Sequence, residues 1–337
     1  MNRTLLCCSV FAFFGCEQDK IVLEKHATIR HVDLAVPATL PKTTWLSVDF
    51  VTALTGYVGG EKGALLGTET GGTSWQNLST PSLGDIKQLH FASATTGLAL
   101  TTTGLYRTTT SGRSWVLVKQ ASYNALTDLQ MLDATTGFLV GNAGLLSKTT
   151  DGGRTWKDYV FLVWPPVTTT LQAVAFASPQ AGFVLGEIQS FKTLNGGTTW
   201  ESTVLEKPRQ VFDLFAYPNG TDYLITGTDD INRNNSFWSM TYQPSTKEYR
   251  QVSAQDLLNV PVYDFAQYQG EVVAVGRKTV LRNYPAYASE PEQTPWVSLL
   301  DQDGTTIQHA YRSADFGDAA TLYAVGEEGI VSRFDYR

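Results

Sequence analysis

The sequence predicts an all-β protein, a seven-bladed β-propeller of four-stranded blades, from three observations. A glycine-bearing turn that ends in tryptophan occurs four times, and its tryptophans lie 40, 41 and 44 residues apart. A short apolar strand recurs seven times, at intervals of 40 to 50 residues. One more apolar strand, near the start, has no repeat of its own. A steady period of this length in a chain of short strands is typical of a sheet repeated around an axis.

The turn is most complete at residues 148–156, Lys-Thr-Thr-Asp-Gly-Gly-Arg-Thr-Trp, and weaker copies end at Trp75, Trp115 and Trp200. Its aspartate accepts hydrogen bonds from nearby backbone N–H groups, its glycines adopt positive φ, and its tryptophan fills the gap between blades. We assign this structural role to Asp151, Gly153, Trp156, Asn195, Gly197 and Trp200. Thr70 and Thr110 are weaker substitutes for the aspartate. One carboxylate per turn is too few for calcium, which takes six to eight oxygen ligands.

The second strand of each unit is the marker that persists through the chain. It is continuously apolar and rich in small residues, as expected for a strand that is buried on both faces. Its seven copies are residues 56–60, 97–101, 137–141, 182–186, 223–227, 272–276 and 322–326.

The seventh unit offers only three strands, at 307–311, 322–326 and 330–334. A blade that lacks a strand would leave unpaired backbone groups at its edge. We therefore expect the unassigned strand at 29–36 to pair in the last blade and close the ring. The propeller is then one domain, residues 27–337.

The N-terminus predicts export. Arg3 precedes an apolar run at residues 5–14, which is shorter than the roughly 20 residues that span a bilayer. Gly15-Cys16 followed by polar residues resembles a bacterial lipoprotein signal, which implies a signal peptide at 1–15, a lipid on Cys16, a polar tether at 16–26, and a place in the bacterial cell envelope, on the periplasmic or surface side of the outer membrane. An ordinary secretory signal and a buried strand are the alternatives.

The composition excludes several functions. The formal net charge is −7, and no stretch shows the clustered Lys/Arg excess that nucleic acids require. Its three cysteines all lie within the first sixteen residues, so the mature chain has no cysteine-based zinc site or nucleophile. His26, His31, His90 and His309 form no close pair in the sequence, and no phosphate-binding loop occurs. We expect neither a metal nor a cofactor.

The repeat of an apolar strand, Gly-aromatic-apolar-apolar-Gly, another apolar strand and Thr-x-Asp-Gly-Gly-x-Thr-Trp resembles the BNR or Asp-box repeat. A single exported propeller of this kind is similar to the photosystem II assembly and stability factor family. The similarity is good over residues 45–200, whereas residues 211–337 share only the second-strand marker. It implies a non-enzymatic protein that holds other proteins during assembly. No binding residue of that family can be carried over to this chain.

Asp-box turns also occur in sialidases and in xyloglucan-cleaving glycosidases, so a carbohydrate-active or glycan-binding protein is the alternative. A glycosidase needs two carboxylates roughly 5 to 10 Å apart. Glu187, Glu327 and Glu328 follow second strands, but no arginine triad of the sialidase kind occurs. Insertions at 229–235 and 284–295 are further candidate loops.

The loops that follow the second strands fall on one face of a propeller, and we predict that this face binds a protein or a glycan. Its mixed charges suit such a surface better than a single anionic ligand. The candidate residues are Glu61, Lys62, Asn142, Glu187, Arg277, Lys278, Glu327 and Glu328. We expect a monomer that reaches the membrane only through its lipid.

Overall fold

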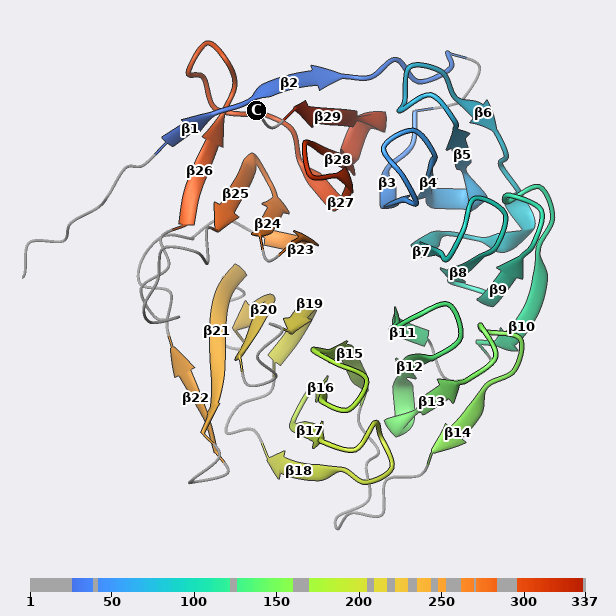
Figure 1. Ribbon diagram of the computed structural model, residues 1–337, viewed down its shortest axis with the longest axis vertical. Coiled ribbons are helices and arrows are strands. Elements are labelled where there is room, and N and C mark those ends of the chain that lie inside the picture. Colours follow the sequence, from blue (N-terminus) through green and yellow to red (C-terminus); the bar gives the residue numbers. More distant parts are fainter. Residues whose placement is uncertain are drawn as a thin grey trace, which may run out of the picture.

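The computed structural model describes residues 26–38, 42–121, 126–159, 170–204, 209–216, 222–229, 235–243, 248–252, 262–269, 271–283 and 296–335. These residues form seven sheets of short strands around a central axis (Figure 1). Helical structure within them is confined to short 3₁₀ turns, at Glu61–Gly63, Pro81–Leu83, Asn142–Gly144 and Glu327–Gly329. No helix in this part of the chain is long and apolar enough to cross a membrane.

The strands follow one another outward from the axis in each sheet. The first sheet contains β3 (Trp45–Phe50), β4 (Gly56–Gly60), β5 (Leu65–Thr68) and β6 (Gln76–Asn77). The second contains β7 (Ile86–Phe91), β8 (Gly97–Thr101), β9 (Gly104–Thr108) and β10 (Val116–Gln120). The third contains β11 (Leu126–Met131), β12 (Gly137–Gly141), β13 (Leu146–Thr149) and β14 (Lys157–Tyr159). The fourth contains β15 (Leu171–Phe176), β16 (Gly182–Gly186), β17 (Gln189–Thr193) and β18 (Glu201–Val204).

The later sheets follow the same order. The fifth contains β19 (Arg209–Ala216), β20 (Asp222–Asp229), β21 (Asn235–Gln243) and β22 (Glu248–Val252). The sixth contains β23 (Val262–Tyr268), β24 (Glu271–Gly276), β25 (Thr279–Asn283), β26 (Trp296–Leu300) and, from the N-terminus, β1 (His26–Thr28). The seventh contains β27 (Tyr311–Asp318), β28 (Thr321–Gly326), β29 (Val331–Asp335) and β2 (Arg30–Asp33).

The all-β class and the four-stranded antiparallel sheets are confirmed, with one exception. The sixth sheet has five strands, because β1 adds to it in parallel. All seven sequence markers fall within the second strands of their sheets. In β4, β8, β12 and β16 every residue is buried, as expected for a strand with a neighbouring sheet on each side.

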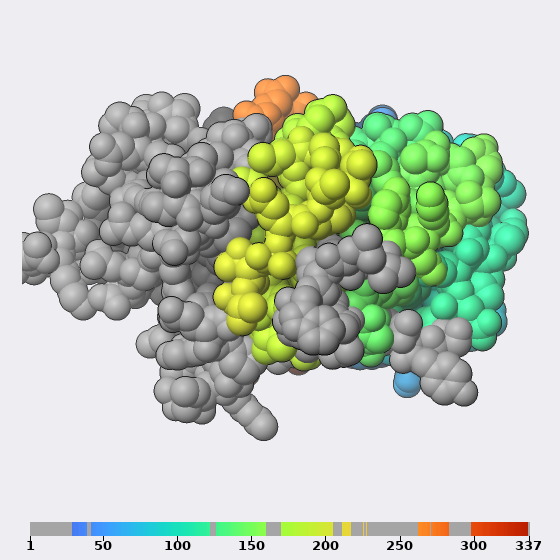
Figure 2. Space-filling view, turned by 90° about the horizontal axis from the view of Figure 1, so that it is seen from below, coloured from blue at the N-terminus to red at the C-terminus, as the bar shows by residue number. Residues whose placement is uncertain are grey.

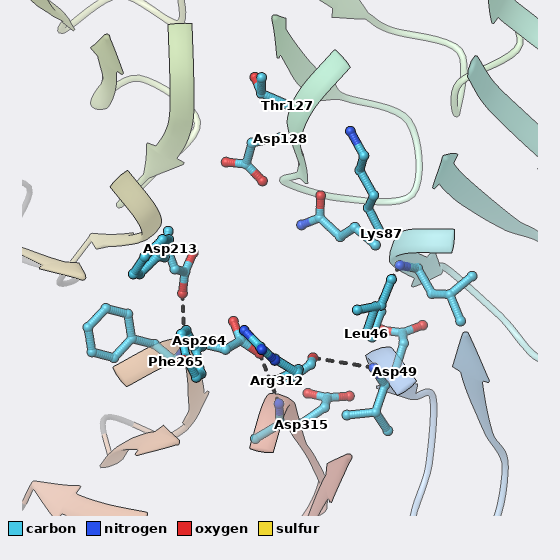
Figure 3. A pocket seen from close by; sticks show the side chains of 18 residues that line it. Leu46, Asp49, Lys87, Thr127, Asp128, Asp213, Asp264, Phe265, Arg312 and Asp315 are labelled. Atoms are coloured by element: carbon cyan, nitrogen blue, oxygen red, sulfur yellow. Dashed lines mark hydrogen bonds between the residues drawn. The ribbon is translucent and has the colours of Figure 1, made fainter. Parts of the chain in front are cut away.

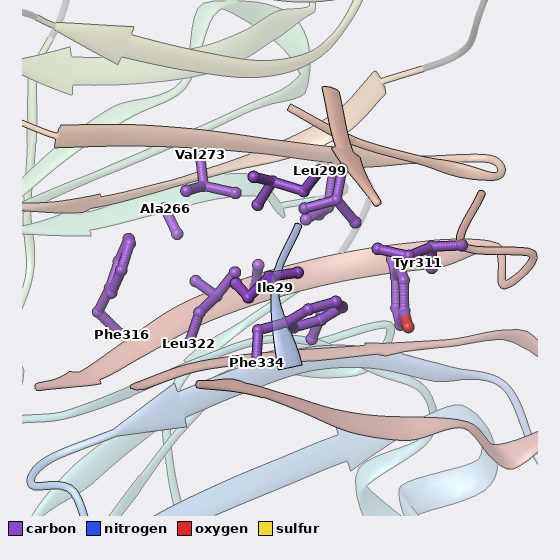
Figure 4. Packing of buried hydrophobic residues seen from close by; sticks show 13 residues of the cluster. Ile29, Ala266, Val273, Leu299, Tyr311, Phe316, Leu322 and Phe334 are labelled. Carbon is purple, nitrogen blue, oxygen red and sulfur yellow. The ribbon is translucent and has the colours of Figure 1, made fainter. Parts of the chain in front are cut away.

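The predicted strand at 29–36 is wrong in its extent. The structure has two shorter strands, β1 and β2, with Ile29 between them. β2 pairs antiparallel with β29, from Arg30 opposite Asp335 to Asp33 opposite Ser332. Ile29 is only 5% exposed and packs in the cluster that joins the sixth and seventh sheets, so the chain crosses there from one sheet to the next (Figure 4).

The predicted first strand of the last unit, residues 307–311, is also wrong. The first strand is β27, Tyr311–Asp318, and Ile307 is a buried loop residue. The true strand escapes an apolar pattern because polar Arg312 and Asp315 lie on the side that lines the central channel.

Apolar clusters between neighbouring sheets form the core. Phe138 of β12 and Phe176 of β15, for example, stack with their ring centroids 4.1 Å apart. Figure 2 views the molecule from its side, where the fourth sheet lies against the third. Each sheet therefore depends on its neighbours for burial.

Several predictions lie outside the described residues. These are the signal segment, Cys16 and most of the tether, together with the insertion at 284–295 and residues 230–234 of the other insertion. β1 begins at His26, the last residue assigned to the tether.

Candidate functional site

A β-bulge occurs at the same place in all seven sheets. In each sheet, the register between the first and second strands shifts at an equivalent residue of the first strand. That residue has no partner opposite it. Bulges re-aim side chains and are common beside functional sites. The seven bulged residues are Leu46, Lys87, Thr127, Gln172, Phe212, Tyr263 and Arg312.

Six of the bulged side chains, all except Gln172, line a cavity of about 260 Å³ at the axis, which we call the channel (Figure 3). We call the end at which the bulges lie the channel mouth. Gln172 instead accepts a hydrogen bond from the backbone N–H of Val211 in the next sheet, at 2.7 Å.

Polar side chains next to the bulges join each first strand to the following one. Ser47 accepts from Leu89 N–H, and Gln88 exchanges two bonds with the backbone of Leu129. The series continues through the third and fourth sheets, where Asp128 accepts from Val174 N–H at 2.8 Å.

The remaining sheets continue the same pattern with carboxylates. Asp213 accepts from Phe265 N–H and Asp264 from Ala314 N–H, each at 2.9 Å. In the last sheet the residue next to the bulge is Ser313, which accepts from Val48 N–H of β3 at 3.3 Å. Asp315, two residues further along β27, accepts from Phe50 N–H at 2.6 Å, so both bonds join the last sheet to the first. The bond from Val211 N–H to Gln172 links the fourth and fifth sheets. Every neighbouring pair of first strands is therefore linked by at least one such bond.

Five carboxyl groups therefore surround the channel: Asp49, Asp128, Asp213, Asp264 and Asp315. Figure 3 shows Asp128, Asp213 and Asp264 pointing toward the axis from three strands. Burial away from water disfavours the charged form, and it raises the pKa of Asp128 and Asp315 to about 7 and that of Asp264 to about 6. A large part of their negative charge is thus absent near neutral pH.

Two aromatic rings and a guanidinium meet at the mouth. The Arg312 guanidinium carbon lies 4.3 Å from the centroid of the Tyr263 ring, and Phe212 lies against Tyr263 with centroids 5.6 Å apart. Arg312 also pairs with Glu327 at 2.5 Å. Phe212 is 36% exposed, a large apolar side chain open to solvent. Such an amphipathic cluster, with cations and aromatic rings, is typical of protein-binding surfaces.

The second-strand loops lie at the mouth end of the sheets. Their backbone contacts the residue just before the first strand, as when Glu61 N–H donates to Thr44 O, Glu187 N–H to Thr170 O and Glu327 N–H to Ala310 O. The eight residues predicted from sequence all lie in these loops. Of these eight residues, the structure places Glu327 directly against a bulged residue, Arg312.

Positive φ values shape these loops. Lys62, Lys278 and Glu328 have φ of 56°, 57° and 58°, which is costly for side chains other than glycine. Lys62 N–H donates to Asp85 Oδ1 at 2.8 Å and Lys278 N–H to His309 O at 2.9 Å. The backbone of the face is held by hydrogen bonds to neighbouring segments, while Lys62, Glu187, Arg277, Lys278 and Glu328 are exposed.

The Asp-box turns lie at the opposite end of the sheets and hold the chain locally. Asp151 accepts from the N–H and hydroxyl of Thr155, which lowers its pKa to about 2, and Asn195 accepts from Thr199 N–H at 2.9 Å. The weaker copies make the same bond with a hydroxyl, because Thr70 Oγ1 accepts from Ser74 N–H at 3.0 Å.

The tryptophans and glycines of the turns face the neighbouring sheet. Trp156 packs with the cluster of the second and third sheets, and Trp200 lies edge-on to Phe138 with centroids 6.4 Å apart. A Cβ on Gly153 would lie 2.7 Å from Leu98 of the preceding sheet, and one on Gly197 2.8 Å from Phe138.

Sequence reasoning missed the mouth residues. Each of these residues lies in a first strand, one residue before a Ser, Gln, Ala or Asp. This shared position can be recognised only when the seven first strands are aligned by their bulges. Phe212, Tyr263 and Arg312 share no residue type, so no motif marks them.

Comparison with known proteins identifies the fold. Residues 107–207 match the family model described as photosynthesis system II assembly factor YCF48. The structure of YCF48 bound to D1 peptide superposes with a TM-score of 0.67 at 16% identity, covering 95% of this chain and all of that one. The chain has a YCF48-like propeller fold. The resemblance that the repeats predict is thereby confirmed. No curated protein sequence matches the chain.

Other propellers share this fold. YCF48 from Cyanidioschyzon merolae gives a TM-score of 0.63 at 14% identity, covering 91% of this chain and 98% of its own. The GH74 enzyme of Niastella koreensis gives the same TM-score and identity over 91% of this chain, which spans only 53% of that enzyme. At these identities the likeness concerns the fold alone.

Proposed function

We propose that the chain is an exported, lipid-anchored and non-enzymatic propeller that binds a protein partner at its mouth face. The mouth face comprises the bulged residues around the channel mouth and the second-strand loops. One observation carries the proposal. Six of the seven bulges direct their side chains to the channel at the same end of the molecule, and these include the exposed Lys87 and Phe212 and the half-buried Tyr263 and Arg312.

The proposal includes an architecture, in which the seven sheets are the blades of one ring that β2 closes. The bonds from Asp315 to Phe50 and from β2 to β29 support it. A chain that lacks residues 26–36 should lose the single cooperative unfolding transition in urea, because the last sheet is left with an open edge. An unchanged transition midpoint would contradict closure by β2.

The chemistry of the mouth favours a partner segment with an apolar or aromatic residue beside a carboxylate. Phe212 and Tyr263 offer ring surface, and Lys87 and the exposed Lys278 offer positive charge, whereas Arg312 is already paired with Glu327. The channel carboxyls behind them carry reduced charge near neutral pH, so they oppose such a ligand weakly. The YCF48 structure with a D1 peptide supports peptide binding as a mode open to this fold.

Photo-crosslinking in the producing cells tests the face. p-Benzoylphenylalanine at position 212 or 278 should give discrete crosslinked proteins. The matched control is position 54, where Leu54 is 59% exposed in the turn between β3 and β4, at the opposite end of the sheet. Equal crosslinking at 54, or none at 212 and 278, would refute the mouth face.

A charge reversal gives a second test of the same surface. Lys278→Glu should reduce recovery of the crosslinked partner by at least about tenfold if it meets a carboxylate, which corresponds to about 1.4 kcal/mol. Arg154→Glu is its control, because Arg154 is exposed in an Asp-box turn at the opposite end.

The non-enzymatic part of the proposal concerns the channel carboxyls, which we assign to holding neighbouring sheets. Each of the five accepts a backbone N–H. The protein should therefore release no reducing sugar from glycoside substrates, and glycan hydrolysis that Asp213→Asn abolishes would establish the alternative of a carbohydrate-active enzyme.

Export and anchoring rest on the sequence alone. Labelled palmitate should be incorporated into the protein, and Cys16→Ser should abolish both the label and the sedimentation with cell envelopes. A Cys16→Ser protein that still fractionates with membranes would contradict lipid anchoring.

A further inference from the structure

Three side chains from opposite ends of the sequence meet at the edge of the seventh sheet. His31 and Asp33 lie on β2, and His309 precedes β27, 276 residues after Asp33. The distance from His31 Nε2 to Asp33 Oδ1 is 3.0 Å, and from His309 Nε2 to Asp33 Oδ2 it is also 3.0 Å. One ligand atom from each residue lies within 4.8 Å of the others.

The side chains around this cluster hold it in place. The His31 ring stacks on Phe334 with centroids 5.0 Å apart and is only 10% exposed. The Asp33 carboxylate accepts a hydrogen bond of 2.6 Å from the Ser332 hydroxyl, which in turn accepts one from Tyr311. Packing and hydrogen bonds thus fix two of the three side chains before any ligand arrives.

His31 has a second carboxylate partner on its other ring nitrogen. Its Nδ1 lies 3.6 Å from Asp301 Oδ2, while its Nε2 lies 3.0 Å from Asp33 Oδ1 and 3.2 Å from the Tyr311 hydroxyl. A metal-binding histidine usually donates its free ring N–H to a carboxylate or a carbonyl, which fixes the tautomer and makes the ligating nitrogen more basic. Asp301 lies beside this nitrogen, at a distance slightly longer than a hydrogen bond.

We propose that His31, Asp33 and His309 bind a zinc ion, with Asp301 as the positioning partner of His31. Two imidazoles and one carboxylate are ligands that zinc accepts, at about 2.0–2.2 Å. Ligand atoms of a tetrahedral zinc site lie about 3.3–3.5 Å apart. Here each histidine nitrogen lies 3.0 Å from a different oxygen of Asp33, and the three ligand atoms lie within 4.8 Å of one another. His309 and Asp33 are 27% and 48% exposed, so water can take the fourth position.

A zinc ion at this place would join the two ends of the described chain. β2 carries two of the ligands, and the segment before β27 carries the third, next to the loop of Lys278 through the bond from Lys278 N–H to His309 O. Zinc that binds the folded chain and not the unfolded one stabilises the fold by mass action. The site adjoins the mouth face through His309, but its three ligand side chains are not among the residues of that face, so zinc binding and partner crosslinking are measured on different residues.

The test uses the full chain without a histidine tag, stripped with EDTA and dialysed. Titration with ZnCl₂ in a calorimeter should give one equivalent of bound zinc. With zinc at about 100 times its Kd, the midpoint of thermal unfolding should rise by about 4 °C. His309→Asn should remove both the binding and the shift, and Asp301→Asn should weaken zinc affinity about 10- to 100-fold.

His90→Gln controls for the loss of a histidine, because His90 lies on β7 in the second sheet. It should bind zinc as the wild type does. A wild-type chain that binds no zinc would leave the cluster as a hydrogen-bonded network and overturn the proposal, as would zinc binding that His309→Asn leaves intact. The result for His309→Asn does not depend on how stable that variant is, because its unfolding midpoints with and without zinc are compared with each other.

Discussion

The substitution Asp128→Asn tests whether burial beside the channel keeps the Asp128 carboxyl protonated, because it should change how stability depends on pH. In the folded protein burial raises the pKa of Asp128 to about 7, whereas an unfolded aspartate titrates near about 3.9. Below about pH 4 both states hold the proton. As the pH rises, the unfolded state loses its proton first, so the free energy of unfolding falls until the folded carboxyl also ionises above about pH 7.

The two pKa values set the magnitude. Their difference corresponds to about 4 kcal/mol, of which about 2.5 kcal/mol is lost between pH 5 and pH 8. Asparagine keeps an acceptor for Val174 N–H but cannot ionise, so the variant should gain up to about 2.5 kcal/mol relative to wild type over that range.

Urea denaturation followed by tryptophan fluorescence, at pH 5 and pH 8, measures this change. The control is Asp133→Asn, since Asp133 is an exposed loop residue whose pKa of about 2 lies far below the range. Its difference from wild type should not vary with pH. If the difference in stability between Asp128→Asn and wild type is the same at pH 8 as at pH 5, the Asp128 carboxyl ionises as readily in the folded protein as in the unfolded one. That result would refute the raised pKa of Asp128.

Two further predictions concern packing, and thermal and urea unfolding check both. Ile29→Ala should lower the free energy of unfolding by about 2–4 kcal/mol, because Ile29 packs between the sixth and seventh sheets. The control Leu54→Ala, at an exposed position, should change it by less than about 0.5 kcal/mol. Equal effects would contradict a closing role for the N-terminal segment. Gly153→Ala should cost at least about 1 kcal/mol more than Gly304→Ala, since both glycines have positive φ but only the first would place a Cβ against Leu98; similar costs would show that the turn does not pack tightly on its neighbour.

The fold could be predicted because its strongest signals are local. A second strand buried on both faces must be apolar at every position, and a turn with positive φ requires glycine, so both recur visibly in the sequence. The first strands are harder to recognise. They face the channel on one side, and polar residues such as Asp213 and Arg312 interrupt the apolar pattern that marks a strand.

The sites could be predicted only in part, for a related reason. The loops after the second strands follow from the repeat, which is how Arg277 and Lys278 enter the candidate face. The cluster of His31 and His309 does not follow from it, because the predicted pairing of the N-terminal strand with the last unit leaves open which side chains of the two segments meet. Sequence spacing carries no information about the contact between Asp33 and His309, which are 276 positions apart.

The channel also explains why the Asp-box turn can disappear from the later sheets while the fold continues. The turn stabilises its own loop and packs on one neighbour, as Gly153 does on Leu98. In the fifth to seventh sheets, which lack it, Asp213, Asp264 and Asp315 each bond the backbone of the next first strand. Bonds of this kind hold neighbouring sheets together at the axis without any outer turn, so the part of the repeat that must persist is the second strand, which is buried between sheets.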